Sequence, residues 1–191
     1  MLVAVSQDGL ALGFADESLM DDYEIVMRAV SNDGPALMYA SERLKAQKDV
    51  VMAAVQQFGG ALEYASRQLR NDHEVVMAAV SQMGVALRFA SVTLQENKGV
   101  CLAAVKQNGF SLGFASRALR GDFDVVLAAV NQYGMALYHA NPRMRANREV
   151  VLAAMTQNSG ALEYASVELK EDEEFVVQTY VAGALRLVGT S

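Results

Sequence analysis

The sequence has no tryptophan and only one cysteine, and aromatic residues make up just 7% of its 191 positions. A single cysteine excludes an intramolecular disulfide framework and is compatible with a reducing compartment, so we expect an intracellular, cytoplasmic location. Valine and alanine provide most of the apolar content, and small side chains suit closely stacked helices better than a thick globular core.

Positive charge is also scarce: 16 Lys and Arg face 22 Asp and Glu, for a net charge of −6. Nucleic-acid binding needs a dense basic surface that neutralises phosphates, so neither duplex nor single strand is an expected partner. An acidic membrane surface is disfavoured for the same reason. No apolar run approaches the roughly 18 residues of a transmembrane helix, so no membrane span is predicted.

The residue patterns of catalytic and metal sites are missing as well. The two histidines, His73 and His139, lie far apart and with one cysteine give no metal-ligand spacing. No histidine lies near the recurrent serines as a Ser-His-Asp triad requires, and every glycine stands outside the phosphate-loop and dinucleotide motifs. The sequence therefore predicts no enzyme activity, no metal and no cofactor.

A 25-residue internal repeat dominates what is present. Glycine recurs at Gly9, Gly34, Gly59, Gly84, Gly109 and Gly134, and a leucine and an alanine keep the same period without an insertion. Such self-similarity is typical of stacked helical arrays. We divide the single repeat domain, 1–191, into units 1–22, 23–47, 48–72, 73–97, 98–122, 123–147 and 148–172, with a C-terminal capping segment at 173–191.

Each unit carries the signals of two helices. At the seven positions that precede residues 23, 48, 73, 98, 123, 148 and 173, six carry Asp or Asn, which predicts an N-cap. About ten residues later the glycine predicts a left-handed helix end, where the following residue packs back on the helix. The A-L-x-[YF]-A segment predicts a shorter helix, and Ser or Asn then caps one further turn. Because the first helix is apolar nearly all round, stacked neighbours must bury it. The predicted fold is all-α: an α-solenoid of seven 25-residue helix–turn–short-helix repeats.

Three columns of equivalent side chains follow from stacking. We expect the aromatic column to form a spine in the core (Phe14, Tyr39, Tyr64, Phe89, Phe114, His139, Tyr164). The amide column should satisfy backbone groups of neighbouring repeats (Gln7, Asn32, Gln57, Gln82, Gln107, Gln132, Gln157). A basic residue four before an acidic one predicts solvated ion pairs at the boundaries between units (Lys45 with Asp49, Arg70 with Glu74, Arg120 with Asp124, Arg145 with Glu149, Lys170 with Glu174). Cys101 replaces a valine and is interpreted as a small buried hydrophobe.

The motif D-x-E-V-V-x-A-A-V-x-Q-x-G-x-A-L-x-Y-A-S-x-x-L-R resembles the tandem repeats of the family called domain of unknown function 4116. The resemblance covers residues 1–177. It implies a short α-helical repeat and a scaffold role, and it supplies no catalytic residues because the family has no assigned activity.

Variation between units points to a binding surface, because positions that stacking does not constrain are free to specialise. Around the glycine and on the short helix, the central units carry mostly large apolar residues, which form the candidate protein-binding patch: Phe58, Met83, Val85, Arg88, Phe110, Tyr133, Met135 and Tyr138. The leading hypothesis is a non-catalytic repeat scaffold that binds a protein partner. The alternative is a structural spacer or accessory segment of a larger protein or complex, without its own ligand.

The two ends differ from the central units. No cap precedes the first helix, and we expect Leu2, Val3, Val5 and Leu12 to face solvent and to drive self-association through the first unit. At the other end the glycine turn is replaced, and the sequence from residue 173 is expected to run on as one longer capping helix.

Overall fold

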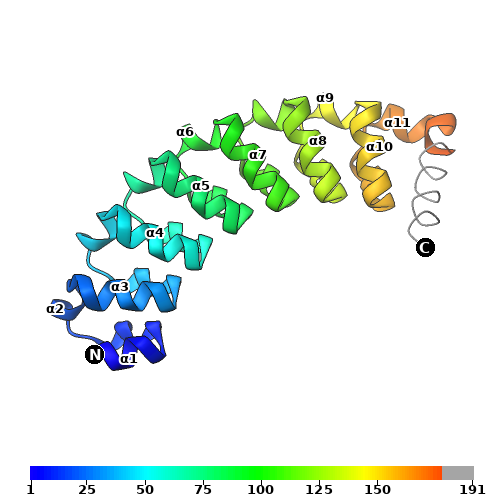
Figure 1. The fold of residues 1–191 in the computed structure, drawn as a ribbon. Coiled ribbons are helices and arrows are strands. Elements are labelled where there is room, and N and C mark those ends of the chain that lie inside the picture. Colours follow the sequence, from blue (N-terminus) through cyan, green and yellow to red (C-terminus); the bar gives the residue numbers. More distant parts are fainter. Residues whose placement is uncertain (178–191) are drawn as a thin grey trace.

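The structure is a computed structural model that describes residues 1–177. Within this range the chain is helical with no strand, and its units stack side by side into an open arc (Figure 1). The all-α solenoid is thereby confirmed.

One α-helix opens each unit. These long helices begin after the cap residue and end two residues before the glycine position: α1 (Leu2–Gln7), α3 (Tyr23–Asn32), α4 (Lys48–Gln57), α5 (His73–Gln82), α7 (Lys98–Gln107), α8 (Phe123–Gln132) and α10 (Arg148–Gln157). Each packs against the long helix of the unit before and of the unit after it. Their C-terminal ends point toward the concave side of the arc (Figure 1), and we call the residues around the glycine there the inner edge.

The second helix of each unit is a 3-10 helix that runs back from the inner edge. These segments form a second layer: η1 (Gly9–Phe14), η2 (Gly34–Tyr39), η4 (Gly59–Tyr64), η6 (Gly84–Phe89), η7 (Gly109–Phe114), η9 (Gly134–His139) and η10 (Ser159–Tyr164). Ser159 simply takes the place of the glycine in the last of them.

A single turn then leads to the next unit along the convex side (Figure 1), which we call the outer edge. These turns are α2 (Glu17–Met20), η3 (Leu44–Ala46), η5 (Leu69–Asn71), α6 (Val92–Gln95), η8 (Leu119–Gly121), α9 (Pro142–Arg145) and α11 (Val167–Glu171).

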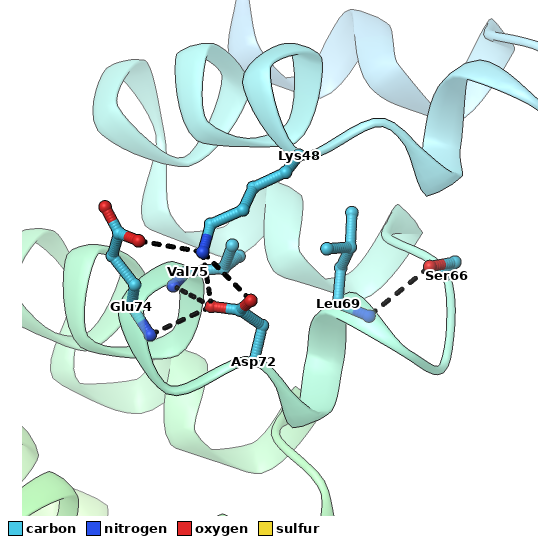
Figure 2. Close-up of polar contacts among 6 residues, drawn as sticks. All are labelled: Lys48, Ser66, Leu69, Asp72, Glu74 and Val75. Atoms are coloured by element: carbon cyan, nitrogen blue, oxygen red, sulfur yellow. Dashed lines mark hydrogen bonds and ion pairs between the residues drawn. The ribbon is translucent and has the colours of Figure 1, made fainter.

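The caps expected from the sequence are present. Figure 2 shows the junction of units 48–72 and 73–97, where the Asp72 carboxylate accepts hydrogen bonds from the backbone N–H groups of Glu74 (3.0 Å) and Val75 (3.1 Å). The Ser66 hydroxyl accepts one from the Leu69 N–H (3.3 Å) and starts the outer turn. Each such acceptor satisfies an N–H that the helix itself leaves open. Gln47, the one unfavourable residue at the long-helix cap position, makes no side-chain cap bond.

The core lies between the two layers. In α5, Val75, Val76, Ala79 and Val80 are fully buried, and Leu87 from η6 joins them. Full burial of one such valine or leucine contributes about 1.5–3 kcal/mol. The pattern recurs in every central unit, so the core is one continuous cluster along the arc.

The glycine turn differs from the prediction. No residue among those described has a positive φ, so the left-handed helix end is wrong. The residue before the glycine is extended instead, as at Met83 with φ −145° and ψ 97°. Glycine is needed because of its neighbour: a Cβ on Gly34 would lie 2.5 Å from the Ala54 carbonyl oxygen of the next unit, and the other five glycines at this position are closer still.

The two ends also refine the prediction. Val5 and Leu12 are fully buried because α1 and η1 pack on the second unit, so the expectation of their exposure is wrong. Leu2 and Val3 are exposed as expected. At the other end residues 173–177 are helical and Phe175 is buried, and the remainder of the expected capping helix lies outside the described residues.

Candidate functional site

The inner edge is held together by the amide column. In each central contact one glutamine bridges two units: the Gln107 Oε1 accepts a hydrogen bond from the Gly84 N–H (2.6 Å), and its Nε2 donates to the Gln82 carbonyl (3.3 Å). Gln57, Gln82 and Gln132 make the same pair of bonds. The structural interpretation of these amides is confirmed, and they are not free to recognise a ligand.

Several ion pairs join the starts of two consecutive long helices rather than residues four positions apart. The Lys48 ammonium lies 3.0 Å from the Asp72 carboxylate and 2.7 Å from that of Glu74 (Figure 2), and Lys98 repeats this with Asp122 (2.9 Å) and Asp124 (2.7 Å). Among the described residues, none of the expected pairs four positions apart is formed. Lys48 and Lys98, the first residues of α4 and α7, lie instead beside the aspartates that cap α5 and α8.

These contacts perturb the titration of both partners. The hydrogen bonds that the Lys48 ammonium donates to Glu74 and then to Asp72 raise the pKa of Lys48. Partial burial alone would raise the pKa of Asp72, but the Lys48 hydrogen bond and the backbone N–H groups outweigh it and lower that pKa. The pairs are solvent-exposed, so each adds little to the free energy of unfolding.

The basic residues that were expected to form the pairs four positions apart lie at the outer edge instead. There the backbone itself joins the units, since the Ser91 N–H donates to the Arg70 carbonyl (2.9 Å) and the Asn141 N–H to the Arg120 carbonyl (2.9 Å). The equivalent Gln95 turns its amide back on its own unit and donates to the carbonyls of Leu87, Arg88 and Ala90 at 3.1–3.3 Å.

The aromatic column lies at the surface rather than in the core. Phe14 is 93% exposed, and the other six members are only partly buried. The aromatic residue follows the buried leucine by two positions, so the two side chains leave the helix in different directions and only the leucine enters the core. Each ring instead lies beside the variable residue of the preceding unit: a Cβ on Gly13 would meet the Tyr39 ring, and one on Gly113 the His139 ring.

Contacts between these rings produce a continuous strip across four units. The Arg88 guanidinium lies over the rings of Phe89 (5.0 Å) and Phe114 (5.8 Å). The Phe110 ring packs edge to face on Phe114 and His139, with ring centroids 5.9 Å and 4.9 Å apart. The Tyr138 ring does the same with His139 and Tyr164, at centroid distances of 5.0 Å and 5.2 Å. We call this surface the aromatic strip: Arg88, Phe89, Phe110, Phe114, Tyr138, His139 and Tyr164.

The structure therefore distributes the candidate patch over two surfaces. Arg88, Phe110 and Tyr138 belong to the aromatic strip, and Phe110 is 45% and Tyr138 61% exposed. Val85 and Met135 lie half-buried on the same layer. Phe58, Met83 and Tyr133 lie at the inner edge instead, where Phe110 and Tyr133 line an open depression of about 360 Å³ with Gln107, Asn108 and Gln132. Because the aromatic column was expected in the core, four members of the strip were not predicted at the surface: Phe89, Phe114, His139 and Tyr164.

Few of the described residues are suited to thiol chemistry or to metal binding. Cys101 is buried as interpreted, its thiol donates to the Gln95 carbonyl (3.2 Å), and burial raises its pKa to about 11. Residues 1–177 contain no cluster of three or more His, Cys, Asp or Glu side chains placed to hold a metal ion. None of the helices in this range has the length and apolar character needed to cross a membrane.

Comparison with known proteins identifies a family only. A family model described as Domain of unknown function (DUF4116) matches residues 1–45, 47–95, 97–145 and 147–179. Each of the two central matches spans two 25-residue units. No curated protein and no solved structure matches the chain.

Proposed function

The chain belongs to the DUF4116 family, and from its surface we propose that it is a non-catalytic repeat scaffold that binds a protein partner through the aromatic strip. The observation that carries the proposal is the exposure of Phe110 and Tyr138 within a continuous row of rings. Solvent-exposed aromatic clusters flanked by arginine are typical of the energetic centres of protein interfaces.

The rigidity of the array supports this proposal. Backbone hydrogen bonds at the outer edge and amide bridges at the inner edge fix each unit relative to the next. The rings are thus presented in a fixed arrangement, and a partner loses little affinity to ordering of the surface on binding.

The repeat provides a matched test. Tyr138→Glu introduces the residue that equivalent positions carry naturally at Glu63 and Glu163, so the fold should be retained. Affinity capture with the wild-type chain should recover a partner that Tyr138→Glu loses. Phe58→Asp, which copies Asp8 and Asp33, alters the inner edge and should leave recovery unchanged.

The other outcomes have definite meanings. Loss of the partner in Phe58→Asp alone would move the interface to the inner edge. Recovery of no partner that depends on Tyr138 would contradict the proposal and favour the alternative, a structural spacer or accessory segment of a larger assembly.

A further inference from the structure

A basic groove lies beside the aromatic strip at the outer edge, between units 98–122 and 123–147. It is an open depression of about 360 Å³ lined by residues of both units, chiefly Arg117, Arg120, Tyr138, His139, Asn141 and Arg145. The Asn141 N–H donates to the Arg120 carbonyl (2.9 Å), so the two walls are joined by the backbone. We call it the arginine groove.

The charge of this groove is uncompensated within the described chain. None of its three arginines takes part in the ion pairs formed by residues 1–177. The Nε atoms of Arg120 and Arg145 are buried and have no hydrogen-bond acceptor. These Nε–H groups are closed to solvent, so an acceptor from outside the chain would bind the remaining N–H groups of the guanidinium ends that line the groove.

The positive charge of the groove also acts on the neighbouring His139. Burial is the main cause that lowers the pKa of His139, and the charge of Arg120 lowers it further. A concentrated positive charge is unusual in a chain whose net charge is −6.

Equivalent grooves show that the arginines are not required for stacking. Between units 73–97 and 98–122, the positions of Arg117 and Arg120 are occupied by Val92 and Gln95, and the units stack in the same way. Two units before the arginine groove, Arg67 and Arg70 line a similar depression of about 660 Å³, and the Arg70 Nε is again buried without an acceptor.

We propose that the arginine groove binds a phosphate group carried by a side chain of the partner protein. Three guanidinium groups carry more positive charge than one carboxylate needs, and their planar forks match the oxygens of a phosphate. A long nucleic acid would be repelled by the acidic remainder of the chain, whereas one phosphorylated residue meets only the local field. The identity of the carrier rests on the proposed function, but the phosphate site itself does not.

The test uses the complete 191-residue chain and probes of defined composition. Titration with inorganic phosphate, followed by nuclear magnetic resonance, should shift the Arg120 and Arg145 Nε–H signals. By calorimetry, a phosphoserine peptide should bind about tenfold or more tightly than its serine counterpart, as expected for charge-assisted hydrogen bonds.

The repeat supplies both the variants and the control. Arg120→Gln and Arg145→Gln copy Gln95 and should abolish the preference for the phosphopeptide, while thermal melting verifies that they fold. Arg28→Ala removes the same charge elsewhere, at a position where other units carry alanine such as Ala53 and Ala78, and should bind like wild type.

Several results would overturn the inference. They are unchanged Nε–H signals on addition of phosphate, equal peptide binding by the Gln variants, or an equal loss in Arg28→Ala. Tighter binding of single-stranded RNA than of the phosphopeptide would reject the protein carrier. A partner lost in Tyr138→Glu but retained after phosphatase treatment would reject the groove and leave the proposed scaffold intact.

Discussion

At the scale of single residues, the recurring glycine is the clearest case of a side chain excluded by a neighbour. Its backbone has an ordinary conformation, and its N–H faces a glutamine of the next unit. At Gly84 an added Cβ would meet the Ala104 carbonyl oxygen, the Gln107 amide oxygen and the Ser111 hydroxyl. Two of these are fixed by the backbone or by the inter-unit bridge, so the space cannot open without separating the units.

Two glycines of this chain should therefore respond in opposite ways to alanine. We expect Gly84→Ala to lower the free energy of unfolding by about 1–3 kcal/mol, the typical cost of overpacking. Gly99→Ala should raise it by about 0.5–1 kcal/mol, because Gly99 is exposed inside α7 and alanine favours helix. Urea unfolding of both variants measures the difference, and a harmless Gly84→Ala would contradict the close packing of this turn against the next unit.

His139 should make stability depend on pH. Burial, and then the charge of Arg120, lower its pKa from the ordinary 6.5. The unfolded chain therefore takes up this proton at higher pH than the folded chain, and stability falls as pH decreases from 6.5 through the folded pKa. His139→Tyr, which copies Tyr39 and Tyr164, should remove this component. Urea unfolding across that window tests the prediction, and parallel pH profiles for the two proteins would refute it.

At the scale of elements, the inner edge depends on one side chain per contact. Replacing Gln107 by alanine removes the acceptor of the Gly84 N–H and the donor to the Gln82 carbonyl. The expected loss is about 1–2 kcal/mol, because the N–H of the buried Gly84 loses its acceptor. The neighbouring exposed Lys106, replaced by serine as in Ser31 and Ser81, is the control and should be nearly neutral. Equal midpoints of urea unfolding for the two variants would show that the bridge contributes nothing.

The sequence predicted the elements well because they depend on local chemistry. Cap residues such as Asp72 and Ser66 act within three residues of their partners, so their spacing is visible in the chain. The contacts across units were predicted less well, since the lateral offset between helices decides them. It places Lys48 beside Asp72 and Glu74, and no pattern inside one unit contains that offset.

The residues of the candidate site were likewise predicted only in part. Variation among units correctly identified Phe110 and Tyr138 as exposed. It gave no indication that His139 and Tyr164 would join them, because those positions are nearly uniform and a uniform aromatic position suggests core.

At the scale of the whole molecule, the first unit leaves apolar side chains exposed. Leu2 and Val3 are exposed, and Phe14 is the most exposed ring of its column. We expect sedimentation of the 191-residue chain to show reversible, concentration-dependent association that Leu2→Lys with Val3→Lys abolishes, because apolar surface loses water on contact. Val5 is unsuitable for this test because it is buried. A monomer at every concentration would refute the prediction.

The two edges of the arc also differ in compliance. Along the convex side, consecutive units share backbone hydrogen bonds of 2.9–3.0 Å, which have no rotatable side chain to absorb a displacement. Along the concave side, the amides donate to the preceding unit across 3.1–3.5 Å, and each amide stands on a flexible stem. A load that pulls the ends apart would therefore lengthen the concave side first and pivot each unit about the convex one. The array should therefore behave as a curved spring under tension, in which the glutamine contacts of the concave side are the first to lengthen and the first to re-form when the load is removed.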